Sequence, residues 1–100
     1  MEKKIFIKDQ TEAKEIQERI VLRKVLLQQL YKNHFKENSG PLIVNIEGDV
    51  QKYREVFQGY QVLRELGLVN YNLVVREEEE GNLILHASLT VKGILEYESL

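Results

Sequence analysis

The stretch that most constrains the fold is residues 53–69, YREVFQGYQVLRELGLV, where an amphipathic pattern ends at a glycine and continues into apolar residues. Gly67 can adopt the left-handed conformation that closes a helix, and Leu68-Val69 can then enter a strand directly. We therefore predict a helix, a sharp turn and a strand here. The apolar side chains recur at three- and four-residue spacing, which places them on one helical face: Tyr53, Val56, Phe57, Tyr60, Leu63 and Leu66.

The start of this central helix is marked by Glu47-Gly48-Asp49, a turn in which Asp49 is the expected N-cap. Gly59 lies inside the helix, where a glycine costs about 1 kcal/mol relative to alanine. It could mark a kink, close packing against another helix, or a break into two helices. We favour one continuous helix, because residues 60–66 alone would form only about two turns.

A long first helix is predicted from Glu12 to about Phe35, since this stretch contains neither proline nor glycine and its apolar residues have helical spacing. Either Asp9 or Thr11 could cap it. Ahead of it, Lys4 to Lys8 resembles a short edge strand, so residues 1–10 are expected to form an N-terminal strand or arm.

Four apolar residues widen the stripe in the middle of the first helix beyond what one buried face needs. A helix that is apolar over so much of its surface is deeply buried or pairs with another chain. In a chain of 100 residues we favour self-association, and therefore predict a homodimer. The residues expected to form this contact are Val21, Leu22, Val25 and Leu26.

The remaining segments predict a small sheet and a closing helix. Residues 42–46 have the composition of a short strand. Residues 68–76 and 82–89 are rich in β-forming residues and are separated by Glu77–Gly81, so they predict a hairpin. Residues 89–98 predict a short final helix with Thr90 as its N-cap. A chain of this length and apolar content supports one domain spanning residues 1–100.

Charge is distributed unevenly along a chain whose formal net charge is −2. Residues 1–36 carry nine Lys/Arg and five Asp/Glu, whereas residues 77–100 carry one lysine and six glutamates. Proteins that bind nucleic acid non-specifically usually have a net basic surface, which is not evident from these totals. The chain has no cysteine, no run of about 20 apolar residues and no signal-peptide pattern, so we expect a cytoplasmic protein.

Residues able to support catalysis or metal binding are sparse. The two histidines, His34 and His86, have no fixed spacing to carboxylates, and the glutamate run lacks the pattern of a calcium loop. The glycines are too widely spaced for a phosphate-binding loop, and the serines are not in nucleophile motifs. We therefore expect no enzyme activity, no metal site and no cofactor.

The order of these elements and two short motifs resemble a winged helix-turn-helix domain. Residues 63–69, LRELGLV, resemble the end of a recognition helix entering the wing, and residues 89–93, LTVKG, resemble the passage from the second wing strand to a final helix. The resemblance is closest to the small single-domain winged-helix proteins of bacteria and their prophages, and it covers roughly Thr11 to Tyr97. It implies an α+β fold with a long first helix, a central recognition-type helix and a β-hairpin wing.

The resemblance also implies a DNA-binding transcriptional regulator whose central helix enters the major groove. Glutamine and arginine can make bidentate contacts with adenine and guanine. Carried over by position, the residues expected to contact double-stranded DNA are Gln51, Lys52, Arg54, Gln58, Gln61 and Arg64.

Two departures from the family pattern keep a second function open. Only three residues separate the strand from the central helix, so the additional helix that the family places there is missing or rudimentary. The predicted wing tip is acidic, and its carboxylates would repel phosphates. The alternative is a winged-helix protein-interaction module that does not bind DNA and whose wing contacts a basic protein partner through Glu78, Glu79 and Glu80.

Overall fold

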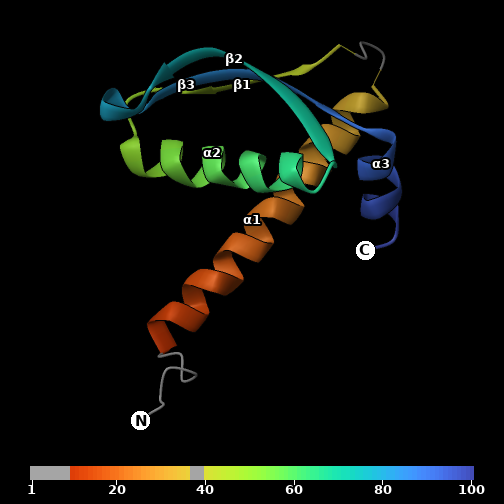
Figure 1. The fold of residues 1–100 in the computed structure, drawn as a ribbon, viewed down its shortest axis with the longest axis horizontal. Coiled ribbons are helices and arrows are strands. Elements are labelled where there is room, and N and C mark those ends of the chain that lie inside the picture. Colours follow the sequence, from red (N-terminus) through yellow and green to blue (C-terminus); the bar gives the residue numbers. More distant parts are fainter. Residues whose placement is uncertain (1–9, 37–39) are drawn as a thin grey trace.

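The structure is a computed structural model that describes residues 10–36 and 40–100. Within them the chain forms a small α+β fold of three helices and a three-stranded antiparallel sheet (Figure 1). The strand predicted at residues 4–8 and the possible cap Asp9 lie outside the described residues. In chain order the elements are α1 (Gln10–His34), β1 (Leu42–Ile46), α2 (Val50–Glu65), β2 (Val69–Glu77), a 3-10 turn η2 (Glu78–Glu80), β3 (Asn82–Leu89) and α3 (Val91–Glu98).

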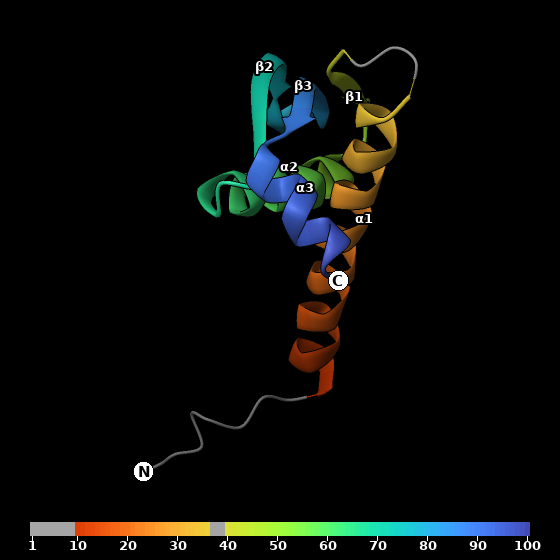
Figure 2. The same ribbon diagram turned by 90° about the vertical axis from the view of Figure 1, so that its right-hand side faces the viewer.

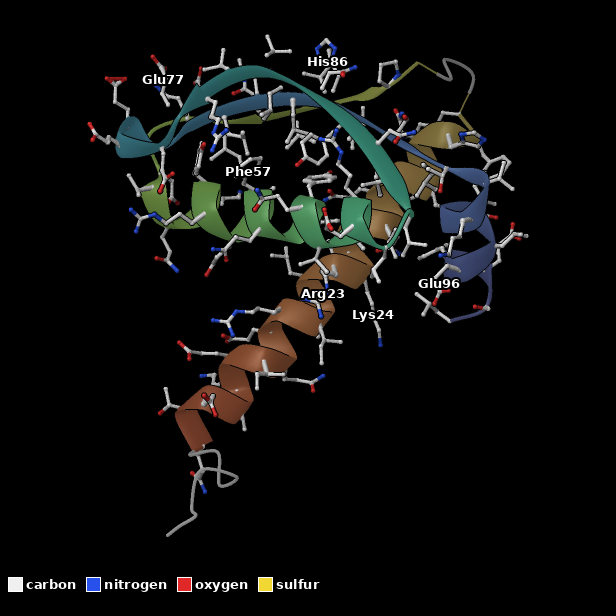
Figure 3. The ribbon with its side chains drawn as sticks, viewed as in Figure 1. Arg23, Lys24, Phe57, Glu77, His86 and Glu96 are labelled. Atoms are coloured by element: carbon white, nitrogen blue, oxygen red, sulfur yellow. The ribbon has the colours of Figure 1, made fainter. Side chains whose placement is uncertain are left out.

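The sheet has the order β1-β3-β2, so the predicted hairpin is confirmed and β1 pairs with its second strand. Within the described residues, the helices cover one face of the sheet: α2 lies along the sheet, α1 crosses α2, and α3 lies at one end (Figures 1 and 2). The register places Leu83, Leu85 and Ala87 of β3 on the covered face, where each is fully buried. The opposite face carries the alternate residues, including His86, which points away from α2 (Figure 3).

The central helix forms as one continuous element, as predicted. Asp49 is its N-cap, and the Asp49 carboxylate accepts a hydrogen bond of 3.0 Å from the Lys52 backbone N–H. Gly67 has a φ of 78° and ends the helical segment. Gly59 marks close packing rather than a kink, because a Cβ there would lie 2.8 Å from Cδ1 of Leu26 on α1.

The turn after α2 is tied to the start of α3. Thr90 caps α3 as predicted: its hydroxyl accepts a hydrogen bond from the Gly93 N–H and donates one of 2.6 Å to the Gly67 carbonyl. The Thr90 N–H also donates to the Leu68 carbonyl at 3.0 Å. The two motifs that carried the family resemblance therefore contact each other directly, at one end of α2.

The first helix begins at Gln10, so Thr11 lies inside it and is not the cap. Its C-terminal part joins the core through Leu26, Leu27 and Leu30, which are at most 4% exposed. Residues 10–21 extend beyond α2 and the sheet (Figures 1 and 2). No helix in the described part of the chain is long and apolar enough to cross a membrane.

Candidate nucleic-acid interface

The outward face of α2 is fixed by the burial of the opposite face. Tyr53, Tyr60 and Leu63 are at most 2% exposed, and they pack with Val56 and Phe57 against the sheet. The helical period then turns the polar residues toward solvent. All six residues predicted to contact DNA are exposed: Gln51, Lys52, Arg54, Gln58, Gln61 and Arg64.

A cleft of about 690 Å³ separates this face from the first part of α1. It forms because the two helices touch at Gly59 and Leu26 and diverge from that contact. The cleft brings together four of the six predicted DNA-contacting residues, and Lys52 and Arg64 are not among its lining residues. Those four are Gln51, Arg54, Gln58 and Gln61.

The α1 side of the cleft carries charges of both signs. Arg19 and Arg23 line it together with Glu15 and Glu18, while α2 adds Glu55 beside its own arginine. The lining therefore contains three arginines and three glutamates. This balance means that α1 and α2 do not join in one basic face, although two α1 arginines do lie beside the α2 residues.

Three of the predicted DNA-contacting residues make contacts within the chain. The Gln51 amide donates a hydrogen bond of 3.0 Å to the Glu55 carboxylate, a pairing that the four-residue spacing could have indicated. The Arg64 guanidinium lies 4.6 Å from the centre of the Tyr71 ring, which draws it toward the sheet. These two contacts leave Gln58 and Gln61 as the residues with the freest access to the cleft.

The third contact ties Arg54 to the acidic turn at the hairpin tip. Arg54 Nε lies 3.5 Å from a carboxylate oxygen of Glu78, and both side chains are more than half exposed. An ion pair this exposed contributes only about 0–1 kcal/mol. No local sequence pattern indicates this pair, because the path of the hairpin brings its two residues together.

The hairpin tip packs against the start of α2. The Gly48 N–H donates a hydrogen bond of 3.0 Å to the side-chain oxygen of Asn82, whose amide group donates to Glu77. Gly81 has a φ of 72°, and a Cβ there would lie 2.5 Å from the Val50 nitrogen. Glu78, Glu79 and Glu80 are therefore held beside the N-terminus of α2, and all three are exposed to solvent.

The residues predicted to mediate self-association divide into two groups. Leu26 is 4% exposed and packs against Gly59, so it belongs to the core of its own chain. Val21 and Val25 remain 49% and 39% exposed, and they line an apolar groove with Leu22. The sequence could not separate the two groups, because all four residues fall on the same broad apolar stripe.

Among the described residues, no three His, Cys, Asp or Glu side chains are grouped as a metal site requires. Comparison with protein-family models, with curated proteins and with solved structures finds no match. The fold and site define a class in physical terms: a small α+β protein with one helix-covered antiparallel sheet and an exposed, glutamine- and arginine-bearing face on its central helix.

Proposed function

We propose that the chain is a winged-helix DNA-binding protein, a homodimeric transcriptional regulator that acts in the cytoplasm and reads duplex DNA with the outward face of α2. The main observation behind the proposal is that α2 is anchored to the sheet by buried side chains while its opposite face exposes side chains able to bond base edges. Tyr53, Tyr60 and Leu63 anchor α2 to the sheet, and the opposite face presents Gln58 and Gln61, for which the described residues provide no hydrogen-bond partner. Glutamine side chains can bond adenine edges in the major groove.

Arg54 adds a group able to bond guanine, provided that it leaves Glu78. Because both partners are exposed and the pair contributes only about 0–1 kcal/mol, a bidentate contact with guanine, worth about 1–3 kcal/mol, is sufficient to displace Glu78. The exchange makes Glu78 a competitor of DNA for Arg54. Glu78 therefore lowers duplex affinity without taking part in the contact.

Phosphate contacts come from α1 in this proposal. Arg19 and Arg23 line the same cleft as the α2 residues, so they lie where the sugar-phosphate backbone would pass if α2 entered the major groove. The glutamates that share the cleft offset this attraction. We therefore expect weak binding to random sequence and a modest dependence on salt concentration, since few phosphates are neutralised.

The test is a titration of fluorescently labelled duplexes with a randomised core, at low and at moderate salt. The wild type is expected to bind in the micromolar range or tighter, and Lys52→Ala with Arg54→Ala is expected to weaken binding at least tenfold. Lys32→Ala with Lys36→Ala is the matched control, because it removes two positive charges from the last turn of α1 and the residues just after it. Absence of binding at tens of micromolar protein, or equal losses in both double variants, would refute the proposal.

A second function, protein interaction without DNA binding, is favoured by the position of the acidic turn. Glu78, Glu79 and Glu80 are exposed and held in one short 3-10 turn, where they present concentrated negative charge to a basic partner. Changing all three to glutamine separates the two functions. The change should strengthen duplex binding if the chain reads DNA, whereas it should abolish binding to an arginine-rich peptide if the turn is the contact surface.

A further inference from the structure

In the described part of the chain, the first part of α1, residues 10–21, contains no buried residue. Among the described residues of this helix, Leu22 is the first that packs against the core. Residues 10–21 extend past the rest of the fold (Figure 2). An isolated helix of roughly 12–15 residues is marginal in water. Residues 10–21 continue from the packed part of α1 and so avoid the cost of nucleation, and a surface that covers them would add to their stability.

An uncovered apolar groove lies where this segment meets the core. It has a volume of about 350 Å³ and is lined by Gln17, Glu18, Val21, Leu22 and Val25. Val21 and Val25 are one helical turn apart and share a face. Val62 of α2, which is 41% exposed, continues the apolar surface, since it lines the neighbouring cleft together with Leu22.

We propose that a second copy of the chain covers this groove by laying its own α1 antiparallel across it, with Val21 of the two copies at the two-fold axis. This face suits a two-fold axis at Val21 because its residues are spaced symmetrically on either side of Val21. Gln17 and Val25 lie four residues to either side, and Lys14 and Gln28 lie seven residues to either side. The two-fold axis then places Gln17 of each copy opposite Val25 of the other.

The order of charges along α1 favours the antiparallel direction. Glu18 and Lys24 flank the face that carries Val21, whereas Arg19 and Arg23 line the cleft toward α2. Packed helices lie about 8–10 Å apart, which is close to the Debye length at physiological salt. Parallel helices would set Glu18 against Glu18, Lys24 against Lys24 and Lys14 against Lys14. Antiparallel helices set Glu18 near Lys24 of the other copy and place Lys14 beside Gln28.

The surface available suits a reversible dimer. A stable interface buries about 800 Å² on each partner, more than two valines can supply. Pairing along residues 14–28 engages about four turns of each helix, so the contact extends well beyond the two valines. We therefore expect dissociation at roughly micromolar concentration.

This inference deepens the homodimer part of the proposed function and rests on it, but it uses none of the α2 residues proposed to contact DNA. Gln51 and Arg54 lie more than a turn of α2 away from Gly59, where the helices touch, so pairing leaves them open. A two-fold dimer would present two copies of α2 to two related half-sites. Self-association can be measured without DNA, so failure of either proposal is distinguishable from failure of the other.

Sedimentation of the full chain at tens of micromolar tests the pairing. The wild type is expected at twice the monomer mass of 11.8 kDa, and Val21→Glu with Val25→Glu is expected at the monomer mass. The matched control is Ile43→Glu with Val74→Glu, since both residues are at least 56% exposed on the sheet. A wild-type monomer, or a dimer that survives the α1 change, would overturn the proposal; circular dichroism verifies that each variant remains folded.

Disulfide trapping tests the direction of the helices, because the natural chain contains no cysteine. Gln17→Cys and Val25→Cys are prepared separately and then mixed under mild oxidation. Antiparallel pairing brings unlike cysteines together, so the mixture is expected to form a covalent dimer at least tenfold faster than either variant alone. Faster trapping in either single variant would indicate parallel helices, and no trapping in the mixture would also contradict the arrangement.

Discussion

Replacement of Tyr60 by phenylalanine probes the packing that aims the outward face of α2. Tyr60 is completely buried beneath that face, and its hydroxyl has no hydrogen-bond partner among the described residues. A buried hydroxyl without a partner costs about 1–3 kcal/mol. Phenylalanine keeps the ring and removes this cost. Tyr60→Phe is therefore expected to raise the free energy of unfolding by about 1 kcal/mol or more at neutral pH.

The same substitution has a pH-dependent signature. Burial raises the pKa of Tyr60 from 10.0 to about 12. Above pH 10 the unfolded chain releases a proton that the folded chain retains, so stability is full below pH 10 and falls as the pH rises toward 12. Two pH units correspond to roughly 3 kcal/mol. This part of the alkaline loss should be absent from Tyr60→Phe.

Urea unfolding followed by circular dichroism at pH 7, 10 and 11 measures both effects. Tyr31→Phe is the contrasting control, because the Tyr31 hydroxyl donates a 2.7 Å hydrogen bond to Glu98 and its removal should lower stability. A loss of about 1 kcal/mol or more in Tyr60→Phe would show that its hydroxyl is satisfied in solution. An unchanged alkaline profile would refute the assigned cause.

Three further changes test other parts of the structure. Gly93→Ala should lower the free energy of unfolding by about 3 kcal/mol, because the new Cβ would overlap the Leu68 carbonyl oxygen. Gly40→Ala is the control and should change this free energy little, because a Cβ there would have no atom within 4 Å. Urea unfolding compares the two variants. Asp49→Ala should lower it by about 1 kcal/mol in the same assay, while Asp49→Asn retains the cap. Glu78→Gln should tighten duplex binding up to about fivefold by freeing its arginine partner, as fluorescence anisotropy can measure, and weaker binding would contradict the competition.

Local signals were sufficient to predict most elements. Asp49, Gly67 and Thr90 act on backbone within a few residues of themselves, and each has the predicted role. The pairing of β1 with β3 joins segments about 40 residues apart. The packing of the hairpin tip against α2 also joins residues that are far apart in the sequence. Nothing near Glu78 in the sequence therefore indicates its contact with Arg54.

The candidate site was predictable only in outline. Helical periodicity identified which residues of α2 face outward, and all six are exposed. Their surroundings depend on the direction in which α1 leaves the contact at Gly59. The residue pattern of either helix alone does not indicate that direction. That crossing places Arg19 and Arg23 in the cleft, and it also brings in Glu15 and Glu18.

The central claim is that the outward face of α2 contacts duplex DNA, and an NMR titration tests it most directly. Backbone amide shifts of the 11.8 kDa chain would be followed as a duplex selected from the randomised pool is added. We predict that the largest changes fall on Gln51, Arg54, Gln58 and Gln61, with smaller changes at Arg19 and Arg23. Changes confined to the open face of the sheet around His86, or to Glu78–Glu80, would contradict the claim.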